Sequence, residues 1–258
     1  AIAKAIEIFH NFSLVHDDIM DNAPLRRGKK TVHEKWNTNI AILSGDVMLV
    51  KAYEELIKGN YTNLAAIIQV FNQTAIEVCE GQQLDMNFET RSSVSLEEYI
   101  EMIKLKTSVL LGGAVKMGAL AVGANENDAQ KIYQFGVNMG IAFQLIDDVL
   151  DLSGNPEEIG KNLGDDLAEG KPTLPLLYTM KKGNDQQKNI IRAAIENGGL
   201  TELESVLNAV KETKALEYVR QLAKEEIEKG EKLIKHITSS VYKDALLALT
   251  QFVILRDY

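Results

Sequence analysis

Two copies of one acidic pattern are the residues of this chain best suited to chemistry. Asp17-Asp18-Ile19-Met20-Asp21 and Asp147-Asp148-Val149-Leu150-Asp151 share the spacing Asp-Asp-x-x-Asp, and each follows an apolar run with helical periodicity. Residues four apart on a helix lie on one face, so the outer aspartates of each copy can bind one ligand together. Carboxylates suit Mg²⁺, and anions at a helix C-terminus are unfavourable unless a cation compensates them. Both copies therefore predict a divalent-cation site, against the alternative of solvated acidic helix ends.

Basic residues follow each acidic pattern. Arg26 and Arg27 come after the first copy, and Lys161 and Lys171 come after the second. Guanidinium groups bind phosphate oxygens in pairs, and ammonium groups act as point charges. Each base alone is typical of a solvated surface, but acids that hold Mg²⁺ beside bases indicate a site for a polyanion such as diphosphate. No Gly-x-x-x-x-Gly-Lys-Ser/Thr occurs, which argues against a P-loop nucleotide site.

Helical elements must position these residues. The apolar spacing predicts helices over residues 1–20, 39–58, 62–88, 96–122 and 127–152. Ser95 with Glu97-Glu98, and Asn127-Asp128, are N-terminal helix signals. Residues 153–172 predict a loop, and shorter helices follow, ending with 245–255. We expect one all-α domain over residues 1–258, with an upstream segment missing because Ala1 already lies within a helical pattern.

Composition limits the class of protein. A net charge of −9 argues against a nucleic-acid partner, which needs a basic surface. The longest uncharged stretches, Tyr61–Ile76 and Ile132–Ile146, are too short to span a bilayer. Cys79 is the only cysteine, which favours a reducing, cytoplasmic setting and, in its apolar helical context, a buried structural thiol.

The sequence resembles the trans-isoprenyl diphosphate synthases, or polyprenyl synthetases, and in particular the short-chain type that makes farnesyl or geranylgeranyl diphosphate. The resemblance runs from Ala1 to about Tyr178. It is carried, besides the two acidic patterns, by motifs in the family's order: Arg26-Arg27-Gly28, Gly81-Gln82-Gln83-Leu84-Asp85, Lys106-Thr107, Phe143-Gln144 and Gly170-Lys171-Pro172-Thr173. The family's upstream Gly-Lys-x-x-Arg segment is absent, consistent with the expected missing segment.

The resemblance implies an isoprenoid synthase-type helical bundle around a central cavity, usually as a homodimer. It implies three Mg²⁺ ions, with Asp17, Asp21 and Asp147 as the main ligands. The full set of implied metal-site aspartates is Asp17, Asp21, Asp85, Asp147, Asp148 and Asp151, with Asp18 beside them as a catalytic residue. The substrates would be an allylic diphosphate and isopentenyl diphosphate, joined head to tail into an all-trans product.

Roles for other residues follow from the same resemblance. Arg26, Lys106 and Lys171 would hold the allylic diphosphate, with Lys161 as a helper. His10 and Arg27 would hold isopentenyl diphosphate. Thr107 and Gln144 would lie beside the developing carbocation, and Gln82 would line the same mouth with Asp85. His10 also precedes Asp17 by seven residues, about 10 Å deeper along one helix face, although a core histidine is the alternative.

Residues just upstream of the first acidic pattern are implied to set product length. Phe9, Phe12 and Ser13 form an aromatic floor with a small neighbour, which favours geranylgeranyl diphosphate with farnesyl diphosphate close behind. Gly136 and Gly140 provide either room for the growing chain or close helix packing. Two rival functions stay open, a class I terpene cyclase and a non-catalytic subunit of a heteromeric synthase.

Overall fold

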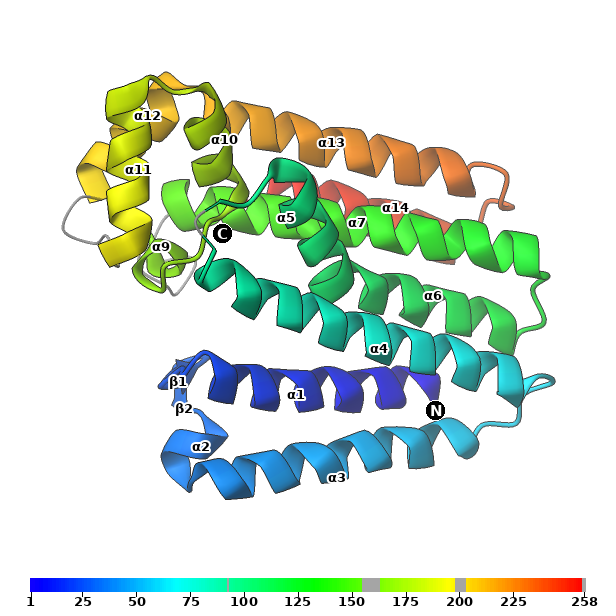
Figure 1. Cartoon of the computed structure of the whole chain (residues 1–258). Coiled ribbons are helices and arrows are strands. Elements are labelled where there is room, and N and C mark those ends of the chain that lie inside the picture. The colour runs from blue at the N-terminus through cyan, green and yellow to red at the C-terminus, as the bar shows by residue number, and fades with distance from the viewer. Residues whose placement is uncertain (92, 155–162, 198–202, 257–258) are drawn as a thin grey trace. The chain divides into compact units, whose positions relative to one another are not determined.

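The computed structural model describes residues 1–91, 93–154, 163–197 and 203–256 (Figure 1). The described residues are almost entirely helical and divide into two compact units. The first unit comprises Ala1–Thr74 and Gly113–Gln130, and the second comprises Ala75–Gly112 and Lys131–Tyr258. The division falls within three long helices: α4 (Leu64–Glu89), α6 (Val109–Ala121) and α7 (Glu126–Ser153). The expectation of a single domain stays a prediction.

The first unit is built on two helices that lie side by side, α1 (Ile2–Met20) and α3 (Thr38–Ile57) (Figure 1). The short helix α2 (Val32–Lys35) precedes α3. A glycine allows the two long helices to approach closely, because a Cβ at Gly45 would lie 2.3 Å from His16 Nε2. Asn37 starts α3 by accepting a hydrogen bond from the amide of Ile40 at 2.9 Å. The C-terminal end of α1 is therefore held beside the start of α3.

A short hairpin with a two-residue turn occupies the basic segment after α1, where the sequence had predicted no strands. Strand β1 (Leu25–Arg26) pairs antiparallel with β2 (Lys29–Lys30), so that Arg26 is opposite Lys29. Arg27 and Gly28 form the turn at positive φ, 52° and 71°, which is the pattern of a type I′ turn. The hairpin gives Arg26 a defined position in the chain just after α1.

The second unit contains the C-terminal part of α4, most of α7 and the helices that follow. These later elements are α9 (Asp165–Ala168), α10 (Leu174–Lys182), α11 (Asp185–Asn197), α12 (Leu203–Glu212), α13 (Ala215–Ile234) and α14 (Val241–Leu255). The apolar positions of α7, among them Leu145, Ile146 and Val149, are buried in its main core. Burial of this apolar face is what holds the second acidic pattern in a fixed helix.

The helix expected over residues 96–122 is broken into three parts. It begins as α5 (Leu96–Ile103), where Ser95 and Glu98 form a complete capping box. A π-helical turn, η1 (Lys104–Ser108), follows and leads into α6. The start at Ser95 is confirmed, whereas the continuous helix is wrong because η1 adds a residue to one turn.

Glycines on two helices lie against the backbone of this π-turn. A Cβ at Gly81 of α4 would lie 2.1 Å from the backbone nitrogen of Lys106, and one at Gly140 of α7 would lie 2.5 Å from Ser108 Cα. Gly136 approaches the backbone of Gly112 in the same way, at 2.8 Å. Of the two interpretations of Gly136 and Gly140, the structure supports close helix packing.

Two smaller expectations need correction. Helix α7 begins at Glu126, and its first turn is capped by Asn125, which accepts from the amide of Asp128, so the start lies slightly earlier than expected. Cys79 is exposed, because its position on α4 faces away from the apolar stripe, and it is not the buried thiol that was expected. Among the described helices, none has the length and apolar character needed to cross a membrane.

The glycine contacts give a testable prediction. We expect Gly140→Ala to lower the free energy of unfolding by about 1–3 kcal/mol, because its methyl group would overlap Ser108. Gly118→Ala is the matched control, since a Cβ there meets nothing within 4 Å, and it should leave stability unchanged or raise it by up to about 1 kcal/mol. Urea unfolding followed by circular dichroism measures both, and equal effects would contradict the packing role.

Candidate active site

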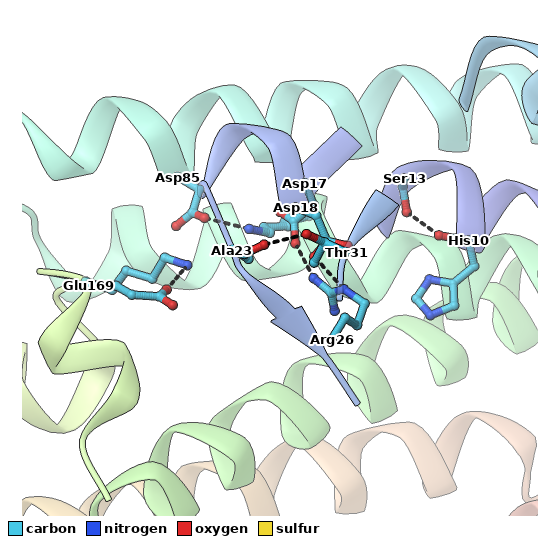
Figure 2. Close-up of polar contacts among 11 residues, drawn as sticks. His10, Ser13, Asp17, Asp18, Ala23, Arg26, Thr31, Asp85 and Glu169 are labelled. Atoms are coloured by element: carbon cyan, nitrogen blue, oxygen red, sulfur yellow. Dashed lines mark hydrogen bonds and ion pairs between the residues drawn. The ribbon is translucent and has the colours of Figure 1, made fainter. Parts of the chain in front are cut away.

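The first acidic pattern lies at the C-terminal end of α1 and is bound by an arginine of the hairpin. Arg26 donates from Nε to Asp18 Oδ1 at 2.6 Å and from a terminal nitrogen to Asp17 Oδ2 at 3.2 Å (Figure 2). Asp21 caps α1, with its amide donating to the Asp17 carbonyl at 2.9 Å. The hairpin itself is tied to the end of α1 by Thr31 Oγ1, which donates to the Ala23 carbonyl at 2.7 Å.

Burial makes the arginine necessary to Asp18. The residue is only 4% exposed, and desolvation raises the pKa of its carboxyl, while the hydrogen bond and charge of Arg26 lower it. Asp17 is less buried, and Arg27 on the outer side of the turn is exposed. A guanidinium that binds two carboxylates here compensates both the buried charge and the negative end of the helix.

The residues expected to set product length lie further back on α1. Phe9 and Phe12 are buried, and their rings lie 5.4 Å apart, with His16 edge-on to Phe12 at 4.8 Å. Ser13 Oγ donates to the His10 carbonyl at 2.8 Å, so its hydroxyl is satisfied within the helix (Figure 2). Burial lowers the pKa of the half-buried His10, and the charges of Arg27 and Arg26 add to this, which favours its neutral form.

In the second unit, the first aspartate of the second pattern is bound by a residue near the chain's C-terminal end. Arg256, just after α14, donates to Asp147 Oδ1 at 2.9 Å, and its guanidinium lies over the ring of Phe143 at 4.1 Å. The Asp147 side chain is 41% exposed, whereas that of Arg256 is 11% exposed. Arg256 had not been assigned a role, because no motif surrounds it.

Asp148 is the most buried of the acidic residues that the structure describes, with no exposed surface. Its carboxylate accepts from three donors: Tyr99 Oη at 2.8 Å, Gln144 Nε2 at 3.2 Å and the amide of Leu174 at 3.2 Å. Burial raises the pKa of Asp148 to about 8, against the lowering effect of the Tyr99 and Gln144 hydrogen bonds. This arrangement suits a residue that orients its neighbours.

The other predicted residues of the second unit form local pairs. Lys106, in η1, donates to Asp85 Oδ2 at 2.6 Å (Figure 2). Thr107 Oγ1 lies 3.5 Å from Gln144 Oε1, at the long limit of a hydrogen bond. Gln82 Nε2 is buried without a protein partner among the described residues. Because Gly81 has no side chain, α4 packs directly against the backbone of Lys106, and this contact fixes the position of Lys106 and Thr107.

The last aspartate and the lysines complete the second unit's candidate residues. Asp151 accepts from the amide of Asp166, at the N-terminus of α9, at 3.2 Å. Lys171 pairs with Glu169 at 2.7 Å (Figure 2). Lys161 lies outside the described residues.

The acidic residues offer the type of donor that a divalent cation requires. Over the described parts of the chain, no three His, Cys, Asp or Glu side chains are grouped so that they could hold a metal ion. Asp17 and Asp147 instead each accept from a guanidinium. Carboxylates that attract a cationic side chain are the hard, anionic donors that Mg²⁺ requires, so the residues fit the ion in chemistry. The expected meeting of the two acidic patterns across a central cavity stays a prediction.

Two residues that sequence reasoning missed, Tyr99 and Arg256, both bind aspartates of the second pattern. Tyr99 carries a weak signal, since it directly follows the capping box of Ser95 and Glu98 and lies seven residues before Lys106. Arg256 carries no such sequence signal, because its partner, Asp147, lies 109 residues earlier.

An all-α fold with two Asp-Asp-x-x-Asp helix ends, each bound by an arginine, defines a class of enzymes that act on prenyl diphosphates. The polyprenyl synthetase family model matches residues 1–213, which include both acidic patterns. The chain belongs to this family, is a prenyltransferase, and has the expected all-α isoprenoid synthase fold.

Similar proteins match nearly the whole chain. A geranylgeranyl diphosphate synthase of Methanosarcina mazei is 40% identical over 99% of this chain and 78% of its own length. An octaprenyl diphosphate synthase of Haemophilus influenzae is 36% identical over 99% of this chain and 77% of its own. The crystal structure of geranylgeranyl pyrophosphate synthetase from Pyrococcus horikoshii superposes with a TM-score of 0.94 at 35% identity, over 99% of this chain and 79% of that one.

The Arg26 contacts predict a stability effect that does not depend on substrate. We expect Arg26→Met to lower the free energy of unfolding by about 1–3 kcal/mol, because it leaves the buried Asp18 carboxylate without its guanidinium. Arg26→Met with Asp18→Asn should recover part of the loss. Arg27→Met, on the exposed neighbour, should change stability by less than about 0.5 kcal/mol. Chemical denaturation measures all three, and equal stability of the two single variants would refute the role of the pair.

Proposed function

We propose that this protein joins an allylic diphosphate to isopentenyl diphosphate, head to tail, and releases an all-trans short-chain prenyl diphosphate and diphosphate. Geranylgeranyl diphosphate is the favoured product and farnesyl diphosphate the near rival. The observation that carries the proposal is the family match over residues 1–213, which spans both acidic patterns and the basic residues that follow them. The relatives named as geranylgeranyl diphosphate synthases support the choice of product.

The proposed reaction needs no protein nucleophile. The allylic C–O bond breaks, and its electron pair leaves with diphosphate. The double bond of isopentenyl diphosphate supplies the pair that forms the new C–C bond, and a proton then passes to the diphosphate. Catalysis therefore rests on neutralising the leaving group and on stabilising the carbocation away from water.

Magnesium is proposed to be held mainly by Asp17, Asp21 and Asp147, with Asp85 and Asp151 contributing. When bound, it would supply positive charge to the departing diphosphate. The guanidinium contacts of Asp17 and Asp147 support this, because they mark two carboxylates that attract a cation.

The other acidic residues are proposed to act indirectly. Asp18 is held by Arg26, and Asp148 is enclosed by three hydrogen-bond donors. We therefore assign both to orienting neighbouring groups, within the metal site that the family resemblance implies.

The basic residues are proposed to bind the two diphosphates. Arg26, Lys106 and Lys171 would hold the allylic diphosphate. The two lysines would exchange their present carboxylate partners for phosphate oxygens, whereas Arg26 would keep Nε on Asp18 and offer its terminal nitrogens. His10 and Arg27 would hold isopentenyl diphosphate. Lys161, which lies outside the described residues, keeps its proposed helper role.

Beside the carbocation, two polar side chains are proposed to face the reacting carbons. Thr107 and Gln144 have oxygens that approach one another, and an oxygen dipole stabilises positive charge. Gln82 carries a buried amide nitrogen without a protein partner among the described residues, which suits a donor to substrate.

A homodimer is proposed from the exposed face of α3. Six large apolar residues on this helix are exposed, and four of them recur at spacings of three and four: Ile40, Leu43, Val47 and Val50. Such a seam is typical of a helix that packs against another helix. A cytoplasmic setting is proposed from the single cysteine.

The two rival functions are disfavoured by the same observations. A class I terpene cyclase usually pairs one Asp-Asp-x-x-Asp helix with a different metal motif, and a non-catalytic subunit usually loses one of the two, whereas this chain keeps both. A cyclase would also release a hydrocarbon or an alcohol instead of a prenyl diphosphate.

The acidic residues provide the test of catalysis. Asp17→Ala and Asp147→Ala should each lower turnover on the order of 10²-fold or more, because a ligand that neutralises the leaving group is lost. The helical circular dichroism should not change. Asp244→Ala, on the exposed first turn of α14, is the matched control. Chelation should abolish turnover and Mg²⁺ should restore it. Near-normal turnover in either site variant would defeat the metal assignment.

Chromatography of dephosphorylated products tests both the reaction and the floor. With Mg²⁺, isopentenyl diphosphate and an allylic starter, the protein should form mainly geranylgeranyl diphosphate. Phe12→Ala should lengthen the products, because it removes a buried ring from the expected floor. Phe71→Ala, in the same aromatic cluster beside Phe9, is the control for lost packing. A hydrocarbon product would favour a cyclase, and an unchanged length in Phe12→Ala would remove Phe12 from the floor.

A further inference from the structure

A buried chain of hydrogen bonds joins α5 to the second acidic pattern within the second unit. Tyr99, on the first turn of α5, is 5% exposed, and its hydroxyl donates to Asp148 Oδ2 at 2.8 Å. The other oxygen of Asp148 accepts from Gln144 Nε2 at 3.2 Å, one helical turn earlier on α7. The amide of Leu174, where α10 begins, also donates to Oδ2. Three donors from three helices thus converge on one carboxylate.

This convergence determines which way the Gln144 amide faces. The Tyr99 hydroxyl and the Leu174 amide both donate to Oδ2 of Asp148, so Oδ1 is left to accept from the NH₂ group of Gln144, and the 3.2 Å contact shows this orientation. The carbonyl oxygen Oε1 then points the other way, and it lies 3.5 Å from Thr107 Oγ1. Without a fixed acceptor on one side, the two ends of a glutamine amide are nearly equivalent in shape and either could face Thr107.

The orientation matters to the chemistry proposed for this site. An amide oxygen carries partial negative charge and stabilises a neighbouring carbocation, whereas an NH₂ group in the same place carries partial positive charge and opposes it. We propose that Tyr99, acting through Asp148, is a positioning residue that holds the Gln144 amide with its oxygen toward the reacting carbons. The proposal rests on the proposed role of Gln144.

The local structure supports a positioning role beyond filling the core. Tyr99 follows the capping box of Ser95 and Glu98, which fixes where α5 begins. The same segment continues into η1, which carries Thr107. One continuous stretch of chain therefore contacts the Gln144 side chain at Thr107 and reaches its other end through Tyr99 and Asp148. A phenylalanine at position 99 would fill the same apolar space and lack only the hydroxyl.

The experiment begins with Tyr99→Phe in the full chain, assayed with both substrates and Mg²⁺. We expect kcat to fall roughly tenfold, while both KM values stay within about twofold, because substrate binding does not use the hydroxyl. Tyr133→Phe is the matched control, since Tyr133 is a half-buried tyrosine of the same unit whose hydroxyl also donates to a carboxylate, that of Glu77. It should leave kcat unchanged. Normal kcat in Tyr99→Phe, or an equal fall in Tyr133→Phe, would overturn the proposal.

A double-mutant cycle then separates the relay from the proposed function. Gln144→Met should lower kcat, and adding Tyr99→Phe to it should cost little more, because the group being oriented is gone. An undiminished effect of Tyr99→Phe in that background would show that Tyr99 does not act through Gln144. If Gln144→Met keeps wild-type kcat, the role of Gln144 fails and the proposal fails with it. If Gln144→Met loses activity while Tyr99→Phe does not, the inference alone fails.

A second variant keeps the test decisive even if Tyr99→Phe folds poorly. In Asp148→Asn, the amide oxygen can still accept from Tyr99 and Leu174, which turns the new NH₂ group toward Gln144. Gln144 must then reverse its amide and present NH₂ near Thr107. We expect kcat to fall at least tenfold, by the same electrostatic argument, with thermal unfolding close to that of the wild type. Wild-type kcat in a folded Asp148→Asn protein would contradict the proposal.

Discussion

Negative charge at the C-terminal ends of helices is the constraint on which the candidate site depends. Helix α1 ends in Asp17 and Asp18, with Asp21 as its cap, and α7 carries three aspartates in its last two turns. The helix dipole opposes such charge, and burial of Asp18 and Asp148 opposes it further. In each unit an arginine from another segment offsets part of this negative charge: Arg26 from the hairpin, and Arg256 from beyond α14. Magnesium ions bound with diphosphate would offset the same aspartate charge.

Two local backbone features, a type I′ turn and a π-helical turn, bring side chains close to these charges. The type I′ turn at Arg27-Gly28 places Arg26 beside the end of α1. In the second unit, Gly81 and Gly140 let two helices touch the backbone of η1, so the π-turn is held between them. Long apolar helices supply the rigid support, and the catalytic candidates lie at their ends and irregular turns, where side-chain direction can be adjusted.

Much of this could be predicted from the sequence because helical periodicity and the repeated acidic spacing are both local signals. Four of the five long helices were expected within two residues of their observed bounds. The π-turn could not be predicted, because Lys104–Ser108 has the composition of an ordinary helix and depends on glycines distant in sequence. The hairpin was missed because its strands are two residues long, too short for alternation to be visible. Arg256 could not be predicted as the partner of Asp147, because the two residues are far apart in the sequence. The exposure of Cys79 was missed because the apolar periodicity did not show which face of α4 carries it.

The π-turn also decides how this segment can change during evolution. Because η1 holds one residue more than an α-helical turn, α5 and α6 are out of phase with each other along the chain. A single-residue deletion between Lys104 and Ser108 would restore one straight helix and rotate everything before it by about 100° relative to everything after it. Tyr99 and Lys106 could not then both keep their carboxylate partners. Insertions and deletions should therefore be tolerated in the loops on either side of this segment and purged from within it.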